Sequence, residues 1–220
     1  QYFNHDVGTA LDNEAIKLTA ATGDVHEIRY LISSRDLQVF AGTGELYVPT
    51  YLNQAITPTN AQIREQTPYG SAFVNPSLID GSTIFVQTSG KIVREYLFTD
   101  SEDAYASTAI STISSHLINT PKYMAVVHSG FNEPDSYAVM SMEDGDAAVF
   151  TSNRAEKRAS WVEFTTNGRF DSLVSIDDRL FCNVYDSNNK LKLCEFTGSI
   201  GLDVYNETSH AVISVTNYIV

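Results

Sequence analysis

The sequence predicts an all-β chain with a β-propeller-like fold of about four blades. Short runs of branched and aromatic residues recur along the 220 residues, and turns rich in Asp and Gly separate them. Aligning the turns at Asp36, at Asp80, before Ser136 and at Asp177 gives spacings close to ~40–50 residues, the length of one propeller blade. A four-stranded meander cannot bury both faces alone, so such units stack radially. We expect one domain over residues 1–220, its ring incomplete and completed by chain outside this sequence.

The clearest hairpin signal lies within residues 78–98. The strand-like runs 83–87 and 91–98 flank Thr88-Ser89-Gly90, and a Gly-containing connection between two such runs predicts a β-hairpin. Asp80-Gly81 predicts a second tight turn just before it. The unit is therefore strand, turn, strand, turn, strand.

Three other stretches repeat this pattern, and we expect each to form short antiparallel strands. They are residues 26–49, 124–150 and 170–197. Residues 153–159 are expected to be a charged crossing loop, followed by a strand at 161–165. In the tail, Ala211, Ile213, Val215 and Tyr218 alternate, which predicts one or two more strands.

Residues 107–118 differ from the rest and predict one short helix between blades. Ile110, Ile113 and Leu117 recur at offsets of three and seven, the helical period. Ser107 or Thr108 can cap the start of this helix, and Pro121 follows its end. We expect the apolar stripe to be packed.

Composition limits the classes of function. Hydrophobic residues make up 43% of the chain, which is enough for a packed core. The net charge of −13 does not suit gripping nucleic acid, because an acidic surface repels phosphate; it is equally explained by solubility. No apolar run approaches the ~20 residues of a membrane helix, and no segment looks like a signal peptide.

The two cysteines predict a facing pair. Cys182 and Cys194 flank a loop at 186–190, so a symmetric hairpin would place them opposite each other. We interpret them as two small buried thiols, ahead of a disulfide bridge. A metal site would need further ligands, and no histidine is near them in sequence.

No catalytic, cofactor-binding or metal-binding residue is predicted. The sequence lacks a Gly-x-Ser-x-Gly nucleophile elbow and a phosphate-binding Gly-x-x-x-x-Gly-Lys loop. No two of its histidines are at metal-ligand spacing, and we expect each to be a packed or surface residue: His5, His26, His116, His128 and His210.

Acidic residues cluster at 100–103, 143–146 and 177–178. Paired carboxylates about 5–10 Å apart can cleave glycosides, but Asp also suits turns between strands. We favour the turn interpretation and keep an alternative, a glycan-degrading enzyme. That enzyme would use Asp100, Asp103, Asp144 and Asp146. Calcium at 143–146 or 186–189 is a weaker alternative, since Lys190 stands where an oxygen ligand is needed.

Several stretches in the first half of the chain resemble sequences of a known family. They are Tyr2-Phe3-Asn4, the block 35–40, Ile56-Thr-Pro-Thr-Asn60 with Gln66-Thr-Pro-Tyr-Gly70, and Ile84-Phe-Val-Gln with Gly90-Lys-Ile-Val-Arg-Glu-Tyr96. They resemble the tail nozzle, or tail tubular protein B, family of short-tailed phages. The second half matches it only as a β-rich blade pattern.

The resemblance implies a structural virion protein and not an enzyme. Family members form a six-fold ring at the far end of the tail, dock on a tail adaptor protein near the tail fibres, and line the channel through which the genome leaves. This chain would be the central propeller-like piece, made in the host cytoplasm and located in the virion. An acidic wall would let DNA slide without sequence-specific binding. A third hypothesis is a glycan- or receptor-binding propeller that uses Tyr51, Tyr69 and Phe131.

Overall fold

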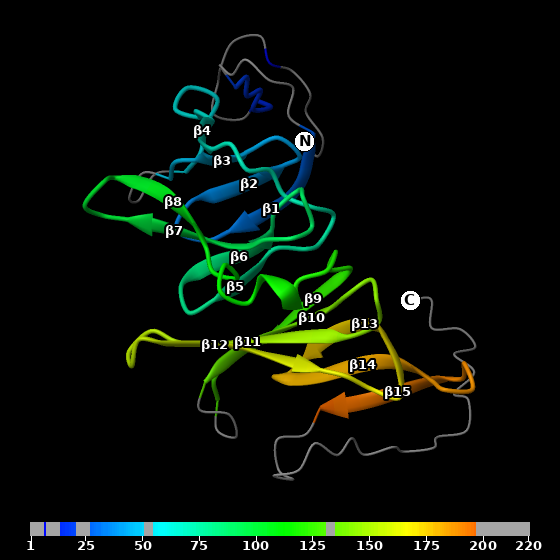
Figure 1. Ribbon diagram of the computed structural model, residues 1–220. Coiled ribbons are helices and arrows are strands. Elements are labelled where there is room, and N and C mark those ends of the chain that lie inside the picture. Colours follow the sequence, from blue (N-terminus) through cyan, green and yellow to red (C-terminus); the bar gives the residue numbers. More distant parts are fainter. Residues whose placement is uncertain (1–6, 8–13, 21–26, 51–54, 131–134, 197–220) are drawn as a thin grey trace. The chain divides into compact units, whose positions relative to one another are not determined.

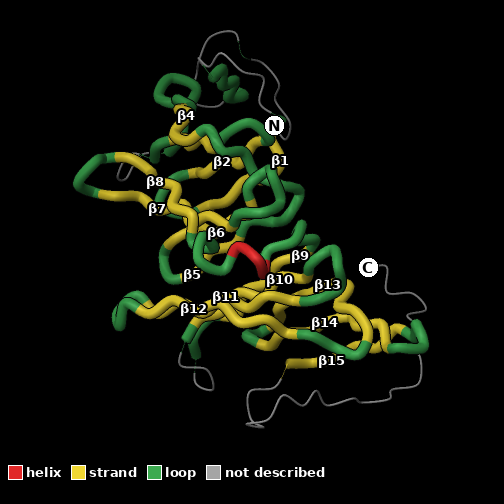
Figure 2. Tube along the Cα trace, in the orientation of Figure 1, coloured by secondary structure: helices red, strands yellow, loops and turns green. Residues whose placement is uncertain are grey.

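The computed structural model describes residues 7, 14–20, 27–50, 55–130 and 135–196. Over these residues the chain is all-β, as predicted: fifteen strands form four antiparallel sheets (Figure 1). The sheets are open and do not close on themselves, which is compatible with propeller-like blades. The helical structure in this part of the chain is one 3₁₀ turn, Ser115–Leu117 (η1), drawn red in Figure 2.

The chain divides into two compact units, Gln1–Pro121 and Lys122–Val220. Each unit contains two of the sheets. We describe each unit by itself; the expectation of one propeller-like domain over 1–220 stays a prediction.

Unit 1 consists of two four-stranded meanders in chain order. The strands of the first are β1 (Ile28–Ser33), β2 (Leu37–Ala41), β3 (Glu45–Val48) and β4 (Arg64–Thr67). The strands of the second are β5 (Ser77–Ile79), β6 (Ser82–Val86), β7 (Val93–Thr99) and β8 (Ala104–Ala109).

The predicted turn residues form the first hairpins of these sheets. Asp80 and Gly81 join β5 to β6 with φ angles of 46° and 79°, the left-handed pair that a two-residue type I′ turn requires. Asp36 lies in the turn between β1 and β2, and Gly90 (φ 68°) accommodates the turn before β7.

An aromatic layer fills the space between the two sheets of unit 1. Phe40 and Tyr47 come from the first sheet, and Phe85, Tyr96 and Tyr105 from the second. The rings of Tyr96 and Tyr105 stack at 4.6 Å, while Phe40 contacts Phe85 at 5.2 Å. Side chains alternate along a strand, so the opposite face of the first sheet carries a separate apolar cluster: Val39, Ala41 and Leu46, with Ala20 and Ile63 against it.

Unit 2 repeats the meander plan with smaller side chains. Its first sheet is β9 (Tyr123–Val127), β10 (Ser136–Ser141), β11 (Ala147–Asn153) and β12 (Arg158–Phe164). Its second is β13 (Gly168–Ile176), β14 (Arg179–Asp186) and β15 (Leu191–Phe196). A mainly aliphatic core joins them, with members from both sheets: Ala125, Val127, Val139, Ala147, Phe170, Leu173, Leu180, Cys182 and Cys194.

Two further sequence predictions are confirmed in unit 2. Asp177 and Asp178 have φ angles of 50° and 58° in the turn between β13 and β14, so this acidic pair is a hairpin turn. Cys182 pairs with Cys194 across β14 and β15, and both are buried thiols that form no disulfide in the described part of the chain.

The predicted helix over 107–118 is wrong. Residues 104–109 form β8, whose backbone pairs with β7, and Ile110 extends that ladder by donating to Val93 at 3.0 Å. Ile113 is 95% exposed, so no packed stripe exists. A short helix without strong tertiary packing is marginal in water, and sheet pairing overrides a three-residue spacing.

The prediction of a crossing loop at residues 153–159 is also wrong. It is a hairpin turn, because Arg158 and Ala159 already pair with β11. The predictions for Tyr2-Phe3-Asn4 and for strands in the tail at 211–218 lie outside the described residues.

We predict that alanine at Gly70 destabilises unit 1 far more than alanine at Gly81. Both have positive φ, which costs an L-residue roughly 1 kcal/mol. A Cβ at Gly70 would lie 2.2 Å from the carbonyl oxygen of Gly42, whereas nothing lies within 4 Å at Gly81. We expect a loss of about 1 kcal/mol for Gly81→Ala and at least about 3 kcal/mol for Gly70→Ala, measured by amide exchange in β3 and β6. Equal losses would contradict the packing seen at Gly70.

Candidate functional site

The candidate site is the polar part of the layer between the two sheets of unit 1, centred on Glu45. Glu45 starts β3 directly after the 41–44 turn, which the bond from the amide of Ala41 to the carbonyl of Gly44 closes at 3.0 Å. It is two positions before Tyr47 on the same strand, so both side chains point to one face of the sheet. The Glu45 side chain therefore lies in the same layer as the aromatic rings. Glu45 is 0% exposed.

The Glu45 carboxyl group is only partly satisfied. Its Oε2 accepts a hydrogen bond from the hydroxyl of Thr67 at 2.5 Å, while its Oε1 has no hydrogen-bond partner among the described residues. Burial raises the pKa of Glu45 to about 7, opposed by the Thr67 hydroxyl, the main-chain amide of Tyr69 and the charge of Arg94. A buried carboxyl with an unpaired oxygen favours the protonated form, because the charged form loses more hydration.

Two buried tyrosines next to Glu45 differ in hydrogen bonding. The Tyr105 hydroxyl donates to Asp36 Oδ2 at 3.0 Å. The Tyr96 hydroxyl is buried and has no hydrogen-bond partner in the described part of the chain. Burial raises the pKa of both phenols, that of Tyr105 to about 12, and the nearby Glu45 charge raises that of Tyr96 further. Neither phenol therefore ionises near neutral pH.

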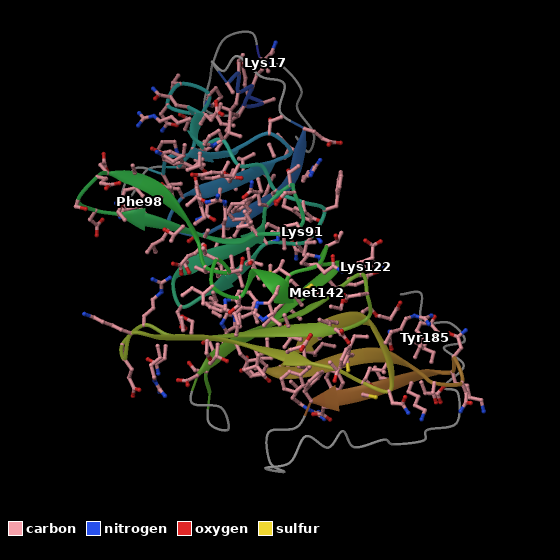
Figure 3. All side chains as sticks on the ribbon, viewed as in Figure 1. Lys17, Lys91, Phe98, Lys122, Met142 and Tyr185 are labelled. Atoms are coloured by element: carbon pink, nitrogen blue, oxygen red, sulfur yellow. The ribbon has the colours of Figure 1, made fainter. Side chains whose placement is uncertain are left out.

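Hydrogen bonds also cross or brace this layer at other positions. The Thr83 hydroxyl donates to Gln38 Oε1 at 2.6 Å, which joins β6 to β2. Asp36 Oδ1 accepts from the Thr50 amide at 2.8 Å and fixes the chain after β3. Phe98, labelled in Figure 3, lies on β7 and packs edge-on against Tyr105 at 5.1 Å.

Arg94 closes one side of the layer without joining Glu45 in a direct ion pair among the described contacts. Its Nε donates to Gln87 at 2.8 Å and its Nη1 to the Ser107 carbonyl at 3.2 Å. Its guanidinium lies 3.3 Å from the centre of the Tyr69 ring, a cation–π contact. Tyr69, a predicted receptor-binding aromatic, is 36% exposed and makes this contact with Arg94.

The carboxylates of the alternative enzyme hypothesis lie in two hairpin turns, one in each unit. Asp100 and Asp103 lie in the β7–β8 turn, where Asp100 pairs with Arg35 at 2.7 Å. Asp144 and Asp146 lie in the β10–β11 turn, where the Asp146 amide donates to Asp144 at 3.3 Å. In each turn, hairpin geometry explains the acidic residues.

Other residues singled out from the sequence lie apart or outside the description. His116 lies in η1 and His128 follows β9. His5, His26, His210, Tyr51 and Phe131 lie outside the described residues. Within the described ranges, no three His, Cys, Asp or Glu side chains are grouped to hold a metal ion, and no helix is long and apolar enough to cross a membrane.

Glu45 is not among the residues that the sequence predicts as a site. The strand pattern does contain a signal for it. Gln38 is two positions from Phe40, and Glu45 is two positions from Tyr47, so each polar residue shares a face with an aromatic residue. Polar residues at inward positions of otherwise aromatic strands predict a buried polar layer.

No protein-family model matches this chain, and no curated protein matches it in sequence. Its function therefore has to be argued from the residues and contacts described above.

We predict that Glu45 makes unit 1 less stable as pH rises. Its pKa is about 7 in the folded state and ordinarily 4.5, so the folded state binds the extra proton between these values. The favourable contribution is fully present below about pH 4.5 and is lost as pH rises through about 7, by roughly 3 kcal/mol.

Glu45→Gln keeps the shape and removes this titration, so it should flatten the dependence of unit 1 stability on pH between 4.5 and 8. Denaturation monitored by amide exchange in β3 tests this. Glu102→Gln, at an exposed turn residue of the same unit, is the control and should follow the wild type. An unchanged slope in Glu45→Gln would contradict the prediction.

We also predict opposite effects for the two tyrosine hydroxyls. Tyr96→Phe removes a buried hydroxyl that has no partner, so stability should stay level or rise by up to about 1 kcal/mol. Tyr105→Phe leaves Asp36 short of a donor and should cost about 1–3 kcal/mol. The comparison is matched because the two rings stack on each other; a larger loss for Tyr96→Phe would contradict it.

Proposed function

We propose that this chain is a non-enzymatic structural subunit of a short phage tail, a nozzle subunit whose ring lines the DNA-ejection channel. One observation carries the proposal: the stretches that resemble the tail nozzle family supply most of the layer between the sheets of unit 1. The members that they supply are Asp36, Gln38, Phe40, Thr67, Tyr69, Phe85, Arg94 and Tyr96.

The resemblance therefore concerns residues that hold two sheets together. Stacked rings and cross-sheet hydrogen bonds resist sliding of one sheet over the other, because each contact has a defined geometry. Such residues suit a stiff wall better than a reaction centre. In the proposal, the four sheets are blades of an incomplete β-propeller.

The net negative charge of the chain supports a role as the wall of a DNA channel. The net charge of −13 opposes tight binding of a phosphate backbone. DNA that passes through a channel needs weak contact with the wall, so an acidic wall lowers adhesion without any base-specific contact. Two basic side chains of unit 1 support the same idea, since Arg35 contacts Asp100, and Arg94 contacts Gln87 and Tyr69.

In this proposal the subunit works only in an assembly. Six copies would form the ring, the tail adaptor protein would bind one side of it, and tail fibres would be its neighbours in the virion. The chain would be made in the host cytoplasm. The alternative, a glycan-binding or glycan-degrading tail protein, has less support, because its carboxylates serve as hairpin turn residues.

The test is assembly of the complete protein with the tail adaptor protein. We expect light scattering and electron microscopy to show a six-fold ring with a central channel, and filter binding to show little retention of duplex DNA at physiological salt. Monomer alone under these conditions would contradict the proposal.

An assay of depolymerisation of host polysaccharide distinguishes the glycan-degrading alternative from the structural role. We expect no depolymerisation by the wild type. Activity that disappears on changing Asp100, Asp103, Asp144 and Asp146 to Ala would favour the enzyme instead.

A further inference from the structure

The proposed structural role makes no use of the thiol pair in the β14–β15 hairpin. Cys182 and Cys194 lie directly opposite each other in the register of these two strands, which run side by side in Figure 1. Both side chains belong to the buried core cluster of unit 2, so they point to the same face of the sheet. The sequence holds only these two cysteines. The one disulfide that this sequence can form within itself therefore joins them.

The geometry of the pair suits a disulfide. Residues directly opposite each other in an antiparallel ladder have Cβ atoms about 4.5–5.5 Å apart, and a disulfide needs about 3.5–4.5 Å between the same atoms. A hydrogen bond already joins the thiol groups of Cys182 and Cys194. Closing the sulfur–sulfur bond therefore requires an approach of about 1 Å and no change of strand register.

Two ion pairs between the strands hold this register. Beyond one side of the thiols, Arg179 on β14 binds Glu195 on β15 through two nitrogens, at 2.5 and 2.6 Å. Toward the connecting loop, Lys192 on β15 lies 3.5 Å from Asp186 at the end of β14. A slip of β15 along β14 would separate both pairs. The thiols between them therefore stay opposite each other, which makes the reaction of one with the other far more frequent than a reaction with a second chain.

Burial makes this pair slow to react but leaves it within reach of a small reagent. Cys182 and Cys194 are 2% and 5% exposed. Burial raises the pKa of Cys182 to about 12, so the unreactive neutral thiol predominates at neutral pH. The outward side chains of the same strand, Leu191 and Leu193, are 55% and 63% exposed. Few contacts cover that face of β15, so local opening of the hairpin can admit a reagent.

We propose that Cys182 and Cys194 form a redox site, which a small disulfide oxidant converts into a disulfide between β14 and β15. One protein thiolate attacks a sulfur of the oxidant, which forms a mixed disulfide and releases one oxidant thiolate. The second protein thiolate then attacks the protein sulfur of this mixed disulfide, forms the new bond and releases the other half of the oxidant. The two protein thiols lose two electrons and two protons, and the oxidant is reduced to two thiols.

The bond would make the hairpin respond to its surroundings. A reducing cytoplasm keeps thiols reduced, whereas oxidising surroundings outside a cell allow disulfides to persist. The disulfide closes a short loop and so stabilises the paired strands against opening. The site lies within unit 2 and its chemistry needs no other subunit, so a negative result here leaves the proposed tail role untouched.

Oxidation of the folded full chain with oxidised glutathione at about pH 8 tests this proposal. We expect mass spectrometry to show a product that has lost two hydrogen atoms and carries no glutathione, and a digest to show the peptides of Cys182 and Cys194 joined. Dithiothreitol should restore the original mass. In the oxidised chain, the amides of β15 should exchange at least about tenfold more slowly than in the reduced chain.

Cys182→Ala and Cys194→Ala are matched controls, because each leaves one thiol in the same hairpin. Neither should lose two hydrogen atoms or gain protection in β15, and amide exchange in β14 reports whether each variant is folded. The mass of the oxidised wild type needs no variant and decides the question if a variant fails to fold. Four results would overturn the proposal: an unchanged wild-type mass, a stable glutathione adduct on the wild type, a disulfide-linked dimer, or a bridge that forms only in denaturant.

Discussion

A carboxyl group enclosed between two aromatic sheet faces is the constraint on which unit 1 depends. Glu45 has no exposed surface, so the surrounding structure must supply its hydrogen bonds or keep it protonated. Thr67 on β4 and the main chain at Tyr69 meet part of this requirement. The group thereby ties the edge strand and the connection after it to the interior, and it opposes a slip of β3 by one residue. Such a slip would move Glu45 to the other face, against Val39 and Ala41 of β2.

Unit 2 shows that the meander plan itself does not need such a group. Its two sheets meet mainly through small and aliphatic side chains, together with Phe170 and two thiols. Burial raises the pKa of Cys182 to about 12, so this thiol stays neutral and packs as an apolar group. The two units thus share strand order but differ in what joins their sheets. This difference makes the polar layer a property of unit 1, and not of the fold in general.

The positions of the sheets were predictable because turn residues are local signals. Asp80-Gly81 and Asp177-Asp178 adopt the left-handed angles that their identity favours. Each of the four aligned turns lies in the first hairpin of one sheet. The facing thiols also followed from counting residues around the 186–190 loop.

The features that could not be predicted from the sequence depend on contacts with residues far away in the chain. Residues 104–109 have a weak local preference, and their strand structure comes from pairing with β7. Glu45 reads as an ordinary polar residue of a short strand until the second sheet covers it. Its neighbour Arg94 lies 49 positions further along the chain, so no short window of sequence contains the site.

Each sheet is built from one uninterrupted stretch of chain, with neighbours in space that are neighbours in sequence. Contacts of this kind close short loops and form quickly. During synthesis on the ribosome, each meander can therefore pair its strands as soon as its last strand emerges. Only the joining of one sheet to the next has to wait for later residues, so misfolding by strand exchange between distant sheets has little time to compete.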